Sequence, residues 1–282
     1  MNAITFREWL IIATQQLAEV SELPRLDAEL LLAAALGQTR STLHAWPERM
    51  LEPEPAACFT AWLERRCSGE PVAYILGHRE FWSLELQVTP DTLIPRPETE
   101  LLVELALERL PVNRPVKVAD LGTGSGAIAL ALAAERPQAR IVATDQSSAA
   151  LAVAWRNAQR LNITHVEFRQ GDWCTPLAGE RFELIVTNPP YVAATDCRWQ
   201  EGELRFEPAA ALISGAEGLD ALQIIIATAP DCLQSSGWLL LEHGYDQGEA
   251  VPALLRKRGF VQVSDYQDAA GLSRSSCGRW PG

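Results

Sequence analysis

From about residue 98 to the end of the chain, short apolar segments alternate with longer segments whose apolar residues recur at helical spacing. Strands are predicted at 116–121, 139–145, 165–172, 182–188, 237–244, 260–266 and 275–280. Helices are predicted at 98–110, 127–136, 148–161, 219–233 and 250–259. Strands and helices that alternate in this manner are typical of an α/β fold. We therefore predict an α/β domain over residues 98–282.

The first part of the chain, residues 1–69, is predicted to be helical. Thr5 and Glu8 form a candidate capping box in front of an amphipathic helix. Pro24 begins a second helix that Gly37 ends, and a third helix covers the segment up to residue 69. We expect a small helical bundle, with docking of a partner as its additional role.

Residues 70–97 have another pattern. The segment "REFWSLELQVT" alternates enough to be strand-like, and "TPDTLIPRPETE" is rich in proline. Together they predict a β-hairpin linker between the helical bundle and the α/β domain.

The composition argues against several classes of protein. The net charge is −12 and the chain has only two lysines, Lys117 and Lys257, whereas nucleic-acid binding depends on many basic phosphate contacts. The longest apolar runs are too short to span a bilayer, and "MNAITFREWL" lacks the features of a signal peptide. The six cysteines form no C-x-x-C pair and no cluster with histidine. We expect a cytoplasmic protein with reduced thiols, no metal, no membrane and no direct nucleic-acid partner.

The segment "DLGTGSGAIAL" lies between the first predicted strand of the α/β domain and its helix. Gly122, Gly124 and Gly126 allow a tight turn and close approach of a ligand to the helix N-terminus. Gly122, Gly124 and Ala127 also fit the dinucleotide pattern G-x-G-x-x-A. From this segment alone, a nicotinamide or flavin enzyme and a turn without ligand are both open interpretations.

Acidic residues at the strand ends favour a different ligand. Asp120 would repel a pyrophosphate but suits an ammonium group, and Asp145 can accept hydrogen bonds from both hydroxyls of a ribose. Asp172 is a candidate partner for the adenine amino group, and Trp173 offers an apolar face to the ring. The alternatives are a helix N-cap for Asp145 and a core position for Trp173.

The segment "TNPPYV" ends another predicted strand, so that Asn188 joins the other corners at the carboxyl edge of the sheet. Ligands of open α/β sheets bind along that edge. Its two prolines stiffen the backbone, which either ends the strand or holds Asn188 and Tyr191 in fixed directions. A ligand with a ribose, an adenine and an amino acid tail but no pyrophosphate is S-adenosylmethionine. The sequence therefore predicts a methyltransferase.

The chain resembles the bacterial release factor glutamine methyltransferases, the HemK-like protein N5-glutamine methyltransferases, over nearly its full length. The matching segments are "GEPVAYILGHREFW", "LIPRPETE", "DLGTGSGAIAL", "GDW", "NPPY" and "LRFEPAAALISGAEGL". The resemblance implies a Rossmann-like class I methyltransferase fold with a seven-stranded mixed sheet, an N-terminal helical domain and a hairpin linker.

The same resemblance implies roles for particular residues. Gly122, Thr123, Gly124, Ser125, Gly126, Asp145, Trp173 and Asn188 would contact S-adenosyl-L-methionine, which leaves as S-adenosyl-L-homocysteine. Asn188, Pro189, Pro190 and Tyr191 would hold the substrate, the glutamine of the Gly-Gly-Gln motif in class-1 peptide chain release factors.

A carboxamide nitrogen is a poor nucleophile because its lone pair is delocalised into the carbonyl. The Asn188 side-chain oxygen and the Pro189 carbonyl would accept hydrogen bonds from that NH2 group and orient it, while Tyr191 would pack against the planar amide. Two other methyltransferases remain as alternatives, one for a ribosomal protein glutamine and one for the amino group of adenine or guanine in DNA or RNA. We expect a monomer.

Overall fold

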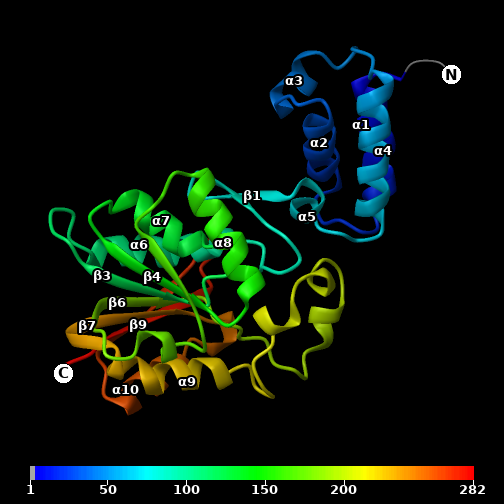
Figure 1. The fold of residues 1–282 in the computed structure, drawn as a ribbon. Coiled ribbons are helices and arrows are strands. Elements are labelled where there is room, and N and C mark those ends of the chain that lie inside the picture. Colours follow the sequence, from blue (N-terminus) through cyan, green and yellow to red (C-terminus); the bar gives the residue numbers. More distant parts are fainter. Residues whose placement is uncertain (1–3) are drawn as a thin grey trace. The chain divides into compact units, whose positions relative to one another are not determined.

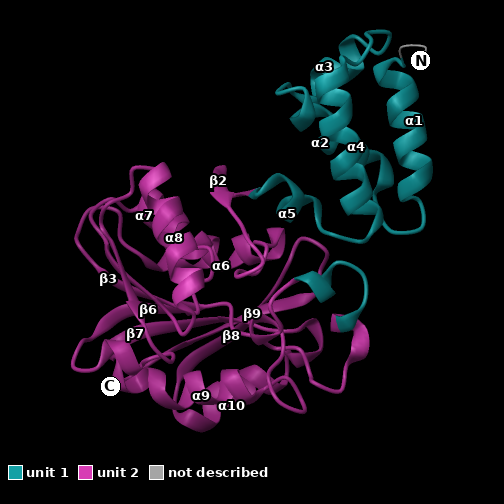
Figure 2. Ribbon diagram, turned by 45° about the vertical axis from the view of Figure 1, so that its right-hand side comes forward, with its two compact units in different colours: residues 1–78, 200–206 teal, residues 79–199, 207–282 magenta. Residues whose placement is uncertain are grey.

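The computed structural model describes residues 4–282, which form two compact units (Figures 1 and 2). Unit 1 comprises Met1–His78 together with Gln200–Phe206, and unit 2 comprises Arg79–Trp199 together with Glu207–Gly282. The first three residues of the segment considered for a signal peptide lie outside the described residues. No helix within 4–282 is long and apolar enough to cross a membrane.

Unit 1 is built from short helices around an apolar core. Its helices are α1 (Phe6–Leu17), α2 (Pro24–Ala35), α3 (Arg40–Ala45), α4 (Pro53–Cys67) and α5 (Val72–Leu76). The capping box predicted at the start of α1 is confirmed, because Thr5 and Glu8 each accept a hydrogen bond from the other's backbone N–H. Phe6, Leu10 and Phe59 are among the side chains buried in the core.

Residues 200–206 join unit 1 through an ion-pair network at a buried arginine. Arg66 on α4 is fully buried, and its guanidinium donates to Asp27 at 2.7 Å and to Glu203 at 2.6 Å. A buried guanidinium without a charged partner would be strongly destabilising, so these ion pairs compensate for its burial.

The predicted hairpin is confirmed, and it is short. Strands β1 (His78–Phe81) and β2 (Leu84–Gln87) pair, and Trp82 and Ser83 between them both have positive φ, 51° and 59°. Two left-handed residues are characteristic of the tight turn that matches the twist of paired strands. The sequence pattern predicts only a hairpin linker over residues 70–97, whereas in the structure α5 precedes the hairpin. Five residues between a proline and a left-handed Gly77 are too few to show helical periodicity.

Unit 2 contains the seven-stranded mixed sheet, which confirms the predicted fold. Its strands are β3 (Lys117–Leu121), β4 (Arg140–Asp145), β5 (Val166–Gln170), β6 (Phe182–Thr187), β7 (Leu233–Glu242), β8 (Val261–Gln267) and β9 (Ser273–Arg279). The order is β5-β4-β3-β6-β7-β9-β8, and β9 runs antiparallel to both of its neighbours. The other pairs are parallel.

Helices cover both faces of this sheet (Figure 1). They are α6 (Glu100–Arg109), α7 (Ala127–Glu135), α8 (Ser148–Arg160), α9 (Asp220–Thr228) and α10 (Ala250–Arg258). The helices α6 and α7 share one apolar cluster with the sheet, and α9 and α10 share another on the opposite face. Short 3-10 turns occupy Pro97–Thr99, Thr175–Leu177, Cys197–Gln200, Leu204–Phe206, Ala209–Ala211, Ala229–Asp231 and Tyr245–Gln247.

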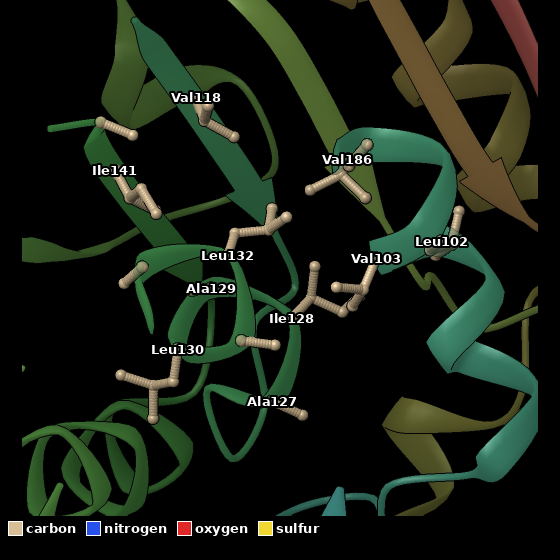
Figure 3. Packing of buried hydrophobic residues seen from close by; sticks show 14 of the residues in the cluster. Leu102, Val103, Val118, Ala127, Ile128, Ala129, Leu130, Leu132, Ile141 and Val186 are labelled. Carbon is tan, nitrogen blue, oxygen red and sulfur yellow. The ribbon is translucent and has the colours of Figure 1, made fainter. Parts of the chain in front are cut away.

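The helix after the glycine segment, α7, is buried along most of its length. Figure 3 shows its side chains among Val118 and Ile141 from the sheet and Val103 from α6. Each fully buried aliphatic side chain contributes about 1.5–3 kcal/mol. Because α7 is packed in this way, it anchors the C-terminal end of the glycine segment that precedes it.

Candidate functional site

Three central parallel strands end in register at one edge of the sheet. Leu121 at the end of β3 is paired with Thr144 of β4 and with Thr187 of β6. The glycine segment, Asp145 and Asn188 therefore begin the loops at the same edge, where ligands of open α/β sheets bind.

The glycine segment forms a left-handed turn. Gly122, Gly124 and Gly126 have φ values of 68°, 56° and 86°. At Gly122, a Cβ atom would lie 3.3 Å from the ring of Trp173, so a side chain there would crowd the indole. The glycine thus leaves room for Trp173 beside the turn.

A residue that sequence reasoning missed holds this turn from behind. Asn157 of α8 is fully buried, and its Nδ2 donates to the carbonyls of Ser125 and Gln87, each at 2.9 Å. Its Oδ1 accepts from the Gln87 N–H at 2.7 Å. The only signal in the sequence was an asparagine on the apolar side of an amphipathic helix.

Asp120 lies behind the turn. It is fully buried, and its Oδ2 accepts hydrogen bonds from Thr123 Oγ1 at 2.7 Å and from the Ala129 N–H at 3.2 Å. Burial raises the pKa of Asp120 to about 7 against the effect of these bonds. Its Oδ1 has no hydrogen-bond partner among residues 4–282, and Asp120 is not among the residues that line the cavity described below. Its contacts stabilise the turn, so the ammonium role remains a prediction from the sequence.

Asp145 lines the cavity and also fixes the turn. Its Oδ2 accepts from the Gly124 N–H and its Oδ1 from the Ser147 N–H, both at 2.9 Å. The helix N-cap is Ser147, whose Oγ accepts from Ala150, so the N-cap alternative for Asp145 is wrong. Burial raises the pKa of Asp145, while the two backbone donors lower it. Each carboxylate oxygen keeps a further lone pair for a ligand.

Asp172 and Trp173 line the same cavity at the end of β5. Trp173 has a positive φ of 42°, which is rare for a residue of this size, and Thr144 Oγ1 donates to its carbonyl at 3.2 Å. Backbone strain of this kind is concentrated at ligand sites. The indole is partly buried against an apolar cluster, so Trp173 combines a core contact with a cavity face.

Alternate residues of the "NPPY" segment lie at different places. Asn188 and Pro190 line the cavity, and Asn188 Nδ2 donates to Thr99 Oγ1 at 3.1 Å. Tyr191 is partly buried in the cluster beneath α9 and α10, and its hydroxyl donates to Glu242 Oε1 at 3.1 Å. Burial raises the pKa of Tyr191. Pro189 is buried and, like Tyr191, is not among the cavity-lining residues. In this structure, therefore, the Tyr191 ring packs against the core.

Thr99 and Glu242 are polar residues of the site that sequence reasoning missed. Both are buried, and Thr99 Oγ1 donates to Glu242 Oε2 at 2.7 Å. Thr99 also lines the cavity. It belongs to the quoted segment "LIPRPETE", but nothing local in the sequence pairs it with the end of β7.

An ion pair connects two walls of the cavity. Arg96, which lines the cavity, binds the buried carboxylate of Glu207, and Glu207 also accepts from the Ile94 N–H at 3.1 Å. Glu207 directly precedes Pro208, which lines the other side. The pair holds the segments "LIPRPETE" and "LRFEP" against each other, a connection that local patterns do not predict.

These parts line a partly open cavity of about 270 Å³, far more than the ~15 Å³ needed to hold a water molecule. Its lining includes Pro90–Leu93, Pro95, Arg96, Thr99, Gly122–Ser125, Asp145–Ser147, Gly171–Trp173, Asn188, Pro190, Pro208, Ala210 and Ala211. The cavity wall offers the backbone of the glycine turn, the Asp145 carboxylate, the Trp173 ring and the Asn188 amide. This donor and acceptor set fits S-adenosylmethionine. Within residues 4–282, no group of three or more His, Cys, Asp or Glu side chains is arranged to hold a metal ion.

Comparisons with known proteins identify related chains. The PrmC N-terminal domain matches residues 8–77, and the methyltransferase small domain matches residues 99–213. The release factor glutamine methyltransferase of Pseudomonas aeruginosa is 54% identical over 256 residues, covering 91% of this chain and 92% of the relative. That of Xylella fastidiosa is 52% identical over 265 residues, covering 94% and 96%. A methyltransferase structure from Pyrococcus furiosus has the same fold, with a TM-score of 0.54, 17% identity, and coverage of 79% of this chain and 99% of that one.

The sheet, its helices and the cavity at its carboxyl edge define a methyltransferase that uses S-adenosylmethionine as methyl donor. Within that class, the chain belongs to the release factor glutamine methyltransferase family. The family and the enzyme class predicted from the sequence are thereby confirmed.

Proposed function

We propose that the protein transfers the methyl group of S-adenosyl-L-methionine to the side-chain amide nitrogen of a release factor glutamine, namely that of the Gly-Gly-Gln motif in class-1 factors. The observation that carries the proposal is the meeting of the glycine turn and the Asn188 amide in one cavity. The names of relatives more than half identical in sequence support the substrate.

The cofactor is assigned to the wall formed by the ends of β3, β4 and β5. The backbone of Gly122 to Gly126 contacts its amino acid portion, Asp145 accepts the ribose hydroxyls, and Trp173 covers the adenine. Asp172 lies beside Trp173 and is assigned to the adenine amino group. The bound cofactor supplies an electrophilic methyl group on a sulfonium.

The acceptor is assigned to the "NPPY" corner. The Asn188 Oδ1 atom and the Pro189 carbonyl accept hydrogen bonds from the glutamine NH2 and aim its nitrogen at the methyl group. Pro190 lines the cavity beside Asn188, and Tyr191 supports the corner through Glu242. Correct placement of the reacting atoms supplies several kcal/mol. Among these residues no strong base contacts the amide position, so orientation and electrostatics carry the rate.

The substrate is a folded protein, and unit 1 supplies the docking surface. The net charge of −12 disfavours a polyanionic substrate. We further propose that the enzyme works in the cytoplasm as a monomer.

A methyl-transfer assay with radiolabelled S-adenosylmethionine tests the proposal. Purified release factor, the same factor with the motif glutamine changed to alanine, ribosomal protein and DNA are compared side by side. Label should enter only the unchanged factor. Label in the altered factor, or in DNA or ribosomal protein instead, would overturn the substrate assignment.

The variant Asn188→Ala tests the acceptor corner in the same assay. It should lose at least about 100-fold in kcat, because the amide acceptor is removed, while cofactor binding by the glycine turn remains measurable. Near-normal turnover would remove Asn188 from the reaction.

A further inference from the structure

A chain of hydrogen bonds leads from the cavity wall to a buried carboxylate. Asn188 Nδ2 donates to Thr99 Oγ1 at 3.1 Å, and Thr99 Oγ1 lies 2.7 Å from Glu242 Oε2. The other carboxylate oxygen accepts from the Tyr191 hydroxyl at 3.1 Å. The exposed fractions of Thr99 and Glu242 are 4% and 1%, so water does not compete for these bonds.

The order of donors in this chain is fixed by chemistry. An ionised carboxylate can only accept hydrogen bonds, so the single hydroxyl proton of Thr99 is directed to Glu242. The oxygen of Thr99 then offers only lone pairs to Asn188, which must present its NH2 group. In a planar amide the oxygen points away from the nitrogen, so Oδ1 of Asn188 is turned away from Thr99.

We propose that Thr99 and Glu242 are positioning residues that hold the Asn188 amide with its oxygen toward the acceptor, which makes the site selective for an NH2 group. The inference rests on the proposed function, because it explains how the site chooses a carboxamide. An amide free to turn over would present its own NH2 to the substrate NH2 in part of the molecules and would not bind it.

The ionisation of Glu242 controls this arrangement. Burial raises the pKa of Glu242 to about 7, against the lowering effect of the bonds from Thr99 and Tyr191. Arg274 lowers the pKa and Glu98 raises it through their charges. A protonated carboxyl can donate to Thr99, whose own proton is then available to an amide oxygen, and the preference for one orientation of Asn188 is lost. Selectivity should therefore fall as the pH falls through about 7.

Other charged groups nearby are already engaged. Arg96 is paired with Glu207, and Arg274 binds Asp268 at 3.3 Å. The high pKa of Tyr191 keeps its phenol a neutral donor over this range.

Four variants test the inference against the wild type. Thr99→Val removes the hydroxyl, and Thr99→Ser keeps it. Glu242→Gln removes the titrating group at nearly constant size. The matched control is Thr187→Val, because Thr187 is a buried threonine next to Asn188 whose hydroxyl donates to Leu121 O instead.

In the methyl-transfer assay, Thr99→Val should lower kcat about 10- to 100-fold with a smaller change in S-adenosylmethionine affinity, and Thr99→Ser should restore most of the rate. The wild-type kcat should fall as pH drops through about 7, and Glu242→Gln should lack this acidic limb. The inference would be overturned by a limb that persists in Glu242→Gln, or by equal losses in Thr99→Val and Thr187→Val.

A second readout needs no substrate. The side-chain NH2 resonances of Asn188 in a nitrogen–proton NMR spectrum, assigned by their absence in Asn188→Ala, should shift with pH through the same range in the wild type but not in Glu242→Gln. The same spectra show whether each variant is folded. Resonances that do not respond to pH in the wild type would refute the inference, whereas inactivity toward release factor alone would refute the proposed substrate.

Discussion

Asp145 binds two backbone N–H groups and lines the cavity at the same time. Hydrogen bonds to a charged group contribute about 1.5–3 kcal/mol each, so removal of those to two ribose hydroxyls should cost at least about 100-fold in affinity. We predict this loss for Asp145→Ala in a calorimetric titration with S-adenosylmethionine.

The control for this prediction is Asp145→Asn, which keeps the size of the side chain and one acceptor oxygen for the Gly124 or Ser147 N–H. It should lose less affinity than Asp145→Ala. If both variants bind like the wild type, Asp145 does not contact the cofactor.

Individual residues of the site could be predicted from the sequence where their position at the end of a strand is enough to locate them. Asp145 ends a strand and Gly122, Trp173 and Asn188 come shortly after strands, and parallel strands bring their carboxyl ends to one edge whatever their other contacts. The partners behind them could not be predicted in this way. Glu242 is linked to Asn188 through Thr99, and tertiary packing brings the three residues together.

Gly126 joins the glycine turn to α7 at an element boundary. Its φ is 86°, and a Cβ atom there would lie 3.1 Å from Leu130 Cδ1 and 3.2 Å from Ala154 Cβ. Gly126→Ala therefore combines backbone strain with tight contacts to which the packed helices must yield by a few tenths of an ångström. We predict a loss of about 2–4 kcal/mol in the free energy of unfolding. Urea denaturation would measure it.

A matched glycine separates the two causes. Gly179 has nearly the same φ, 82°, but no atom within 4 Å of a Cβ. Gly179→Ala should lose only the strain component, about 1 kcal/mol. Equal losses in the two variants would show that contact with Leu130 and Ala154 does not matter.

Elements with a strong periodic pattern were predicted closely. The strand predicted at 139–145 is observed as Arg140–Asp145, and the helix predicted at 148–161 as Ser148–Arg160. The strand predicted from Gly237 begins earlier, at Leu233, because Leu233 pairs with Phe182 of β6 ahead of a register shift, and regular pairing resumes at Trp238. The short helix α3 was missed for the same reason as α5, since six residues carry too little periodicity.

At the scale of the whole molecule, the segment Gln200–Phe206 belongs to unit 1, although the residues on both sides of it in the chain belong to unit 2. The predicted boundaries at residues 69 and 97 follow composition, whereas Gln200–Phe206 belongs to unit 1 through Arg66 and Glu203. No local pattern marks a contact between residues so far apart in the chain. The segment follows "NPPY", so the chain itself links the acceptor corner to the unit that we assign to docking.

Unit 1 also exposes large apolar side chains suited to a protein partner. Trp46 and Met50, between α3 and α4, have exposed fractions of 54% and 52%. Aromatic residues such as Trp are frequent among those that dominate binding energy. If unit 1 docks the substrate, a short peptide carrying the Gly-Gly-Gln motif reaches only the cavity and lacks these contacts.

We therefore predict that the intact release factor is methylated with a kcat/KM at least about 30-fold higher than that of the peptide, because two or more such contacts contribute about 1–2 kcal/mol each. Trp46→Ala and Met50→Ala should lower kcat/KM for the factor and leave that for the peptide unchanged, since neither residue lines the cavity. Parallel assays with both substrates separate docking from chemistry. Equal kcat/KM for peptide and factor would show that the cavity alone recognises the substrate, and equal losses on both substrates would show that Trp46 and Met50 act through the fold.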